Sequence, residues 1–314
     1  MHVALRVTCI TLFRKGIMQN TISFRKKARA RWGVIFVIPT CVVLFVFVFY
    51  PICYTLVLSL NEYNFAYDMH MKFVGLKNFV DMFKDIQFLT ALKNTLQFTL
   101  FMFVILVVLS LSLALLLFNK KRRSWLYRVS IFMPIVVPAS LICILFSFML
   151  ADNFGIVNKF LVSIGLSGWS HNWLTDAKTA RVWVIIVSVW GKVGFCTILF
   201  LSGLQNISQD MFEAAEIDGA VGWKKLIHIM IPNLTETFVV VGIWAILQCL
   251  KLFVTPNVLT KGGPANATLV MYQNIYNTAF NYFDMGYAAA QAFVLTALVM
   301  IFSLLNMKLS KGEN

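Results

Sequence analysis

Six long apolar stretches, separated by polar segments, dominate the pattern of residues along the chain. They run over Gly33 to Leu60, Thr95 to Phe118, Val129 to Leu150, Val182 to Leu204, Phe238 to Leu259 and Gly286 to Met307. Each can cross the hydrocarbon core of a bilayer, which takes roughly 20 residues of helix. Helices also satisfy their own backbone hydrogen bonds in lipid. The pattern therefore predicts an all-α integral membrane protein with six transmembrane helices.

Composition agrees with this prediction and excludes a soluble domain. Of 314 residues, 60% are hydrophobic and only 13% are charged, too few to cover the apolar surface.

We expect a basic N-terminal segment at 1–32, a six-span membrane domain at 33–307 with a core transport region over about 91–307, a loop at 205–234 and a tail at 308–314. The sequence is compatible with a start at Met1 or at Met18.

The distribution of Lys and Arg predicts the orientation, because positive residues near span ends are retained in the cytoplasm. Residues 1–32 and 119–128 are basic and contain no acid, whereas acids balance the lysines in residues 61–94 and 151–178. With six spans, both termini and the loop at 205–234 are then cytoplasmic. The net charge of +14 follows from this topology, and we expect no nucleic-acid partner.

The loop at 205–234 has the pattern of two short helices joined at a glycine. Asp210 and Glu213 are spaced for a capping box at the start of the first helix. Gly219 permits the left-handed turn that ends it. Trp223, Leu226, Ile227 and Met230 follow at the spacing of one apolar stripe, and Pro232 is expected to stop the second helix. An ordinary amphipathic surface loop is the alternative.

The same segment resembles a known docking motif. Glu213-Ala214-Ala215, then Gly219, and Ile229-Met230-Ile231-Pro232 nine residues later match the EAA loop of binding-protein-dependent ABC importer permeases, except that Ile231 stands where the family usually has Leu. The resemblance implies a type I ABC importer permease-like fold. It also implies that the loop couples to a separate ATPase through Glu213, Ala214, Ala215, Asp218, Gly219 and Pro232.

The implied assembly contains a homologous second permease, two cytoplasmic ATPase subunits and an extracytoplasmic solute-binding protein. The chain has no Gly-x-x-x-x-Gly-Lys-Ser/Thr phosphate cradle of its own. We therefore expect ATP and Mg²⁺ to be bound by the partner ATPases, and no cofactor by this chain. No residue set suggests catalysis or a metal site, so we expect a non-catalytic subunit. Cysteines in the spans are expected to act as small packing residues.

A second resemblance points to a carbohydrate substrate. Leu250-Lys251-Leu252-Phe253 and Leu259-Thr260-Lys261-Gly262-Gly263-Pro264 are similar to the fifth-span exit and outer loop of sugar permeases of the maltose and glycerol-phosphate type, although Val254 replaces a frequent Asp. We expect a sugar or oligosaccharide route near Trp190, Gln248 and Lys251. Lys192 is a further candidate because a lysine is costly in lipid. Gly262, Gly263 and Pro264 are candidates for contact with the solute-binding protein.

Three alternatives stay open at this point. The chain could serve an importer for an amino acid, a peptide or another non-sugar solute, because the docking loop is shared across substrate classes. A secondary carrier would need acids inside the spans, and none lies well inside any of the six. A structural membrane scaffold could use the loop only to hold a cytoplasmic partner. The residues do not specify which sugar is carried.

Overall fold

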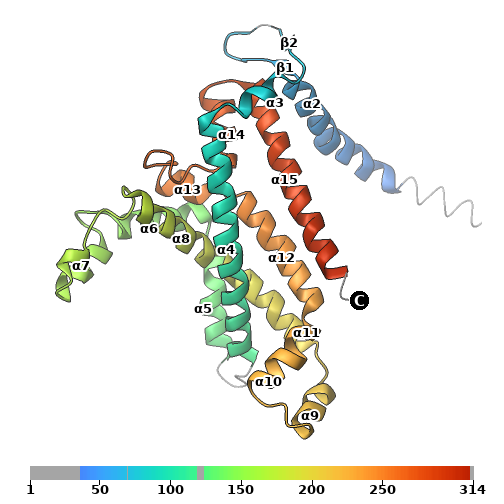
Figure 1. Ribbon diagram of the computed structural model, residues 1–314, viewed down its shortest axis with the longest axis vertical. Helices are drawn as coiled ribbons and strands as arrows, with labels where there is room; N and C mark the ends of the chain where they lie inside the picture. Colours follow the sequence, from blue (N-terminus) through green and yellow to red (C-terminus); the bar gives the residue numbers. More distant parts are fainter. Residues whose placement is uncertain (1–35, 69, 119–123, 312–314) are drawn as a thin grey trace, which may run out of the picture. The chain divides into compact units, whose positions relative to one another are not determined.

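The computed structural model describes residues 36–68, 70–118 and 124–311, and Figure 1 traces their helices. These residues are mostly helical, and the helices are joined by turns, by loops such as residues 260–270, and by one small two-stranded sheet. They fall into two units: the first ends at Val57 and the second begins at Leu58. The prediction of an all-α fold is confirmed. The basic residues of segments 1–32 and 119–123, on which the predicted orientation depends, lie outside the described residues.

The first unit holds most of the first span, a continuous helix over Phe36–Ser59. It contains a wide π-helical turn, η1 (Phe45–Phe49), followed by α2 (Tyr50–Ser59). The side chains of residues 36–54 are exposed, including Cys41 and Cys53. These two cysteines therefore do not pack inside this structure, in contrast to the expectation. The apolar exterior is the one that a lipid-facing helix requires.

Four long helices carry the second unit: α4 (Ile86–Phe118), α8 (Ala177–Gln205), α12 (Thr235–Leu250) and α15 (Met285–Lys311). Figure 1 shows α4, α12 and α15 running beside one another, and α8 packs along α4. The second span begins nine residues earlier than predicted, at Ile86 rather than Thr95. Its added turns bury Phe88 and Ala91 against Leu269 and Met271, a tertiary contact that local hydropathy does not reveal.

The third predicted span is not a straight helix. It consists of α5 (Ser124–Val136) and α6 (Ala139–Met149), which bend by 98° at the break between them. Pro138 precedes α6 with φ −54° and ψ 132°. Because proline disfavours helical geometry in the residue before it, the helix stops ahead of Pro138. Pro134, by contrast, stays inside α5.

The fifth predicted span is also interrupted. Residues 251–253 separate α12 from α13 (Val254–Leu259), and Phe253 takes φ −141° and ψ −58°. The chain then returns through a loop to α14 (Met271–Tyr276) and the π turn η4 (Asn277–Asn281) before the last span. Within the part of the chain that is described, five helices can cross a membrane, or six if the bent pair counts as one span.

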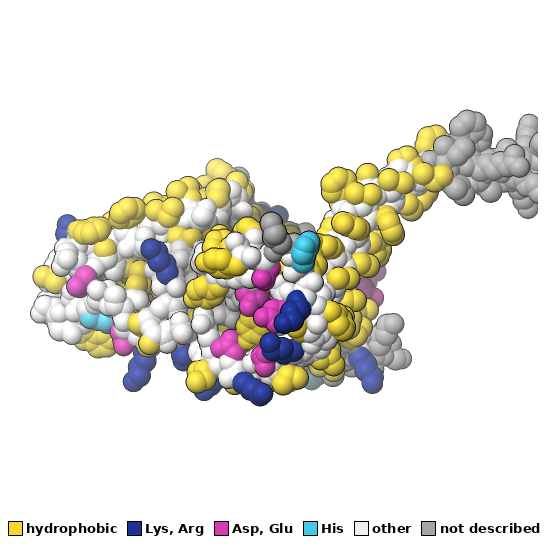
Figure 2. Space-filling view, turned by 90° about the horizontal axis from the view of Figure 1, so that it is seen from above, with side chains coloured by type: hydrophobic (Ala, Val, Ile, Leu, Met, Phe, Trp, Pro, Cys, Tyr) yellow, Lys and Arg dark blue, Asp and Glu magenta, His cyan; other side chains and the backbone are white. Residues whose placement is uncertain are grey.

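One end of the second unit is built from short elements: β1 (Asn61–Glu62), β2 (Lys72–Phe73) and α3 (Lys77–Met82). The strands pair antiparallel, with Asn61 opposite Phe73. Figure 2 looks onto this end and shows acidic and basic side chains gathered close together. Helices α7 (Ile156–Ser163) and η2 (Ser167–Trp169) form a separate projection between α6 and α8.

The core of the second unit consists of apolar clusters stacked along the long helices. One joins α4, α6, α8, α12 and α13 and includes Phe98, Met102, Cys143 and Cys249. Another joins α4, α8, α12 and the loop before α12, and includes Cys196 and Phe200. The buried cysteines at 143, 196 and 249 pack as small side chains, as expected. These clusters fix α8 and α12 relative to each other.

Candidate functional site: an exposed helical loop and an intramembrane cavity

The loop between α8 and α12 forms a helical projection at the end of the second unit opposite β1 and β2 (Figure 1). Its first helix is α9 (Gln209–Ile217), which begins after Ser208. The predicted capping box is wrong, because the helix starts before Asp210. Asp210 instead lies in the first turn, where its charge suits the helix dipole, and the Glu213 carboxylate accepts a bond of 3.0 Å from the Gln209 side chain.

The end of α9 has the geometry predicted from the glycine. Gly219 takes φ +74°. The Ala220 N–H donates to the Ala215 carbonyl at 2.8 Å and the Gly219 N–H donates to the Glu216 carbonyl at 3.1 Å. This pair of bonds is the Schellman arrangement that ends helices at a left-handed residue. The turn reverses the chain and exposes Gly219 and Asp218 at its tip.

The two faces of α9 differ in burial. Glu213 and Ala214 are exposed, whereas Ala215 is buried at 4% exposure. Of the three residues Glu213-Ala214-Ala215, the first two therefore lie on the surface and the third packs inward. Ala215 packs inward because it lies two positions from Glu213, on the opposite side of a helix.

The second half of the loop is one helical run of three pieces: α10 (Trp223–Lys225), the π turn η3 (Leu226–Met230) and α11 (Ile231–Asn233). Pro232 does not end it, contrary to the prediction. Pro232 lies in the first turn of α11, where its missing N–H is tolerated after the wide π turn. The predicted apolar stripe is also divided, because Met230 is buried but Trp223 is 77% exposed.

An ion pair ties the two halves of the loop together. The Lys225 ammonium lies 2.8 Å from a Glu216 carboxylate oxygen and 4.6 Å from the centre of the Phe212 ring. The hydrogen bond from Lys225 lowers the pKa of Glu216 below its ordinary value. Beside this pair lies a hollow of about 880 Å³ that includes Glu213 in its lining. Ile217, at 87% exposure, adds an uncovered apolar side chain to the projection.

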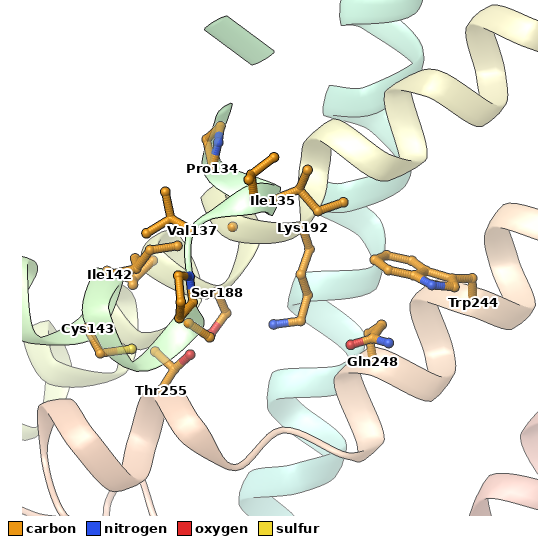
Figure 3. A pocket seen from close by; sticks show the side chains of 15 residues that line it. Pro134, Ile135, Val137, Ile142, Cys143, Ser188, Lys192, Trp244, Gln248 and Thr255 are labelled. Carbon is orange, nitrogen blue, oxygen red and sulfur yellow. The ribbon is translucent and has the colours of Figure 1, made fainter. Parts of the chain in front are cut away.

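A second candidate site is a cavity of about 370 Å³ among the helices of the core. The break between α5 and α6 supplies one wall, and α8, α12 and α13 supply the others. Figure 3 shows the Lys192 ammonium extending into it, between Gln248 on one side and Ser188 and Thr255 on the other. Trp244 adds an indole ring one turn from Gln248. The cavity thus combines a cation, neutral polar groups and an aromatic face.

The three residues predicted for the sugar route do not meet in one place. Gln248 lines the cavity. Trp190 is exposed and its ring packs 5.6 Å from that of Phe146. Lys251 lies outside the cavity, in a separate groove of about 380 Å³ with Tyr272, Tyr276 and Phe280.

The sequence interpretation missed Ser188, Trp244 and Thr255. Two spacings could have identified the first two, because Ser188 and Lys192 are four residues apart on α8, as are Trp244 and Gln248 on α12. Residues at this spacing share one face of a helix. Thr255 follows the break at 251–253 and carries no such signal.

The predicted outer-loop residues lie in a constrained turn. Gly262 takes φ +84° and is buried, while Gly263 and Pro264 are half-buried. The Thr268 hydroxyl donates to the Gly263 carbonyl at 2.7 Å. The exposed residues of the turn are its neighbours Lys261, Ala265 and Asn266.

The outer loop that contains this turn, between α13 and α14, is fastened to the long helices by side chains of α4 and α8. Asn94 donates to the carbonyls of Asn266 and Leu269, and Arg181 donates to that of Ala267 at 2.9 Å. Thr95 accepts a bond from the Met271 N–H. A contact of the turn with another protein would therefore be made by a fixed surface.

Comparisons with known proteins give a consistent result. Residues 106–312 match the family described as "Binding-protein-dependent transport system inner membrane component". The "Probable ABC transporter permease protein YurN" of Bacillus subtilis is 34% identical over 88% of this chain and 95% of its own length. The "Lactose transport system permease protein LacF" of Rhizobium radiobacter is 37% identical over 87% of this chain and 92% of its own length.

A solved structure shares the fold. One chain of a bacterial ABC transporter involved in the import of the acidic polysaccharide alginate matches with a TM-score of 0.80 and 21% identity, over 92% of this chain and 98% of that chain. At this identity the match supports the overall fold alone. From the family match and these two relatives together, the chain belongs to the inner-membrane components of binding-protein-dependent transport systems, the permease subunits of ABC importers.

Proposed function

We propose that the chain is one permease subunit of an ATP-driven importer for a sugar or oligosaccharide, and that α9 to α11 couple it to an ATPase on a separate chain. The strongest support is the form of this loop. Gly219 and Asp218 are exposed at a tight turn, and the Glu216–Lys225 ion pair holds its two halves together. A rigid projection can transmit the movement of a docked protein to the helices on either side of it.

The loop also presents the surface that a docking partner requires. Ile217, Val221 and Trp223 are large apolar residues, and all three are exposed around the turn. Exposed apolar groups rimmed by charges are typical of protein interaction sites. Glu213 and Ala214 lie on the same projection and leave the backbone of α9 accessible. Ala215 supports it from the buried side.

The remaining partners follow from the family. A second, homologous permease would complete the translocation pathway, two ATPase subunits would bind ATP and Mg²⁺, and an extracytoplasmic solute-binding protein would deliver the solute. Both termini and the projection would lie in the cytoplasm. ATP binding would favour the outward-open state, because the closed ATPase dimer holds the projections together.

The cavity around Lys192 and Gln248 supports the carbohydrate assignment. An indole face stacks on a sugar ring, and amide, hydroxyl and ammonium groups bond its hydroxyls. All four chemistries are present, in Trp244, Gln248, Ser188 and Lys192. The volume of about 370 Å³ falls within the range of small-molecule sites. The name of the relative LacF, a lactose permease, is consistent with the same class of solute.

The coupling role is tested with variants of the loop in the complete transporter. Glu213→Ala and Gly219→Trp should insert normally but hydrolyse ATP without accumulating sugar. Glu236→Ala is the matched control, because it removes an exposed acid at the start of α12, beyond the projection. Normal sugar accumulation by both loop variants would contradict the proposal. Labelling of a cysteine at position 219 by a reagent confined to the outside of cells would contradict it as well.

A further inference from the structure

The Lys192 side chain is a cation without a counter-ion in the described part of the chain. Its ammonium extends into the cavity of Figure 3, and none of the fifteen lining residues is Asp or Glu. The two salt bridges among residues 36–68, 70–118 and 124–311 involve Lys77 and Lys225. A lysine on a membrane span is costly unless it meets water or an opposite charge. The sequence places no acid within the spans that could serve it.

A second unpartnered group lies in the same wall of the cavity. The Ser188 hydroxyl, on a residue only 2% exposed, has no hydrogen-bond partner. It is one helical turn from Lys192 on α8. A buried hydroxyl left without a partner is unusual in a folded protein. The two neighbouring groups are therefore placed to bind something that enters the cavity.

The chemistry of the two groups defines a preferred ligand. A carboxylate offers acceptors for the Lys192 ammonium and the Ser188 hydroxyl at once, whereas a neutral hydroxyl leaves the charge uncompensated. Hydrogen bonds between charged partners are about twice as strong as neutral ones. Gln248 and Trp244 remain available for the rest of a saccharide. The wall lacks any acid that would repel an anion.

We propose that the cavity selects a saccharide with an acidic substituent, and that Lys192 is the residue that determines this preference. This inference rests on the proposed function, because it assumes that the solute passes through the cavity. Ser188 acts with Lys192 as a hydrogen-bond donor to the anionic group. The preference belongs to the permease itself and is separate from the selection that a solute-binding protein makes.

The test is saccharide binding to the purified complex of both permeases and the ATPases, without the solute-binding protein. Equilibrium dialysis compares labelled digalacturonate with labelled galactobiose, its neutral counterpart. A charge-assisted bond predicts that the acidic sugar binds about tenfold more tightly or better. Lys192→Gln should bring the ratio close to one, and Lys192→Arg should retain most of it. Lys178→Gln, which removes an exposed lysine at the start of α8, outside the lining of the cavity, is the matched control.

Each outcome separates this inference from the proposed function. Equal or tighter binding of galactobiose would overturn the acidic preference and leave the sugar-importer proposal intact. An acidic preference that Lys192→Gln leaves unchanged would overturn the role assigned to Lys192, and so would a preference that the control variant also loses; both outcomes leave the sugar-importer proposal intact. An acid of the companion permease paired with Lys192 would likewise give no acidic preference. Binding of neither sugar would contradict the proposed function.

Discussion

The hydrogen bonds of the Asn94 side chain allow a quantitative prediction for the stability of the loop before α14. Asn94 is 2% exposed, and its amide donates to the carbonyls of Asn266 at 2.8 Å and Leu269 at 2.9 Å. Its side-chain oxygen accepts a bond of 3.3 Å from Arg181. Asn94→Leu keeps the approximate size of the side chain but removes all three bonds. The fold of the loop should then loosen where it crosses α4.

The magnitude follows from which groups can reach water after the substitution. Leu269 is buried, so its abandoned carbonyl costs about 1–3 kcal/mol. Asn266 is exposed, so water replaces the lost donor and the net cost there is about 1 kcal/mol. The longer bond from Arg181 adds little, because that side chain is exposed. The total is about 2–4 kcal/mol.

Two measurements check this value on the detergent-solubilised transporter. Thermal unfolding should show a melting temperature several degrees lower for Asn94→Leu. Hydrogen exchange should be faster at the Met271 amide, whose N–H is held by Thr95 at 2.8 Å. Gln97→Leu is the control, because Gln97 lies almost one turn along the same helix and is exposed. Equal melting temperatures and exchange rates for the two variants would refute the reasoning.

Three further substitutions test separate parts of the structure by thermal unfolding. Burial raises the pKa of Asp284 above its ordinary 3.8, so the charged form costs stability above that pH. Asp284→Asn should therefore stabilise at pH 7, with a gain that fades as the pH falls toward 3.8; a gain independent of pH would contradict this cause. Gly286→Ala should destabilise by about 1–3 kcal/mol, because the added methyl would collide with the Asn61 carbonyl. Gly168→Ala has open space and should be neutral, so similar losses in both would refute the steric cause. Gly219→Val should cost about 1–2 kcal/mol through its left-handed backbone, and an unchanged melting temperature would count against that conformation.

The sequence predicted those parts of the fold that are determined by residues close together in the chain. The spans follow from hydropathy because lipid imposes the same requirement on each of them. The left-handed turn at Gly219 follows from the residue type, since a glycine after a helix adopts that conformation at little cost. The family resemblance placed the loop between two spans, and the structure has a helical projection there.

The errors concern features that depend on tertiary contacts or on competing local effects. Pro134 and Pro138 both interrupt the apolar pattern, yet only Pro138 breaks the helix. Pro232 was expected to stop a helix, but a preceding π turn accommodates it. The cavity draws residues from α8, α12 and α13, and no local spacing relates Thr255 to Lys192. Such groupings require the packing of helices that are distant in sequence.

The most direct test of the central claim is solute uptake by the complete transporter in three preparations of liposomes. One encloses ATP, one encloses ADP, and one has an ion gradient across its membrane and no nucleotide. The solute-binding protein and labelled sugar are added outside. We predict accumulation only with enclosed ATP, and its loss in Gly219→Trp while ATP hydrolysis continues. Accumulation driven by the ion gradient without ATP, or undiminished uptake by the loop variant, would contradict an importer powered through α9 to α11.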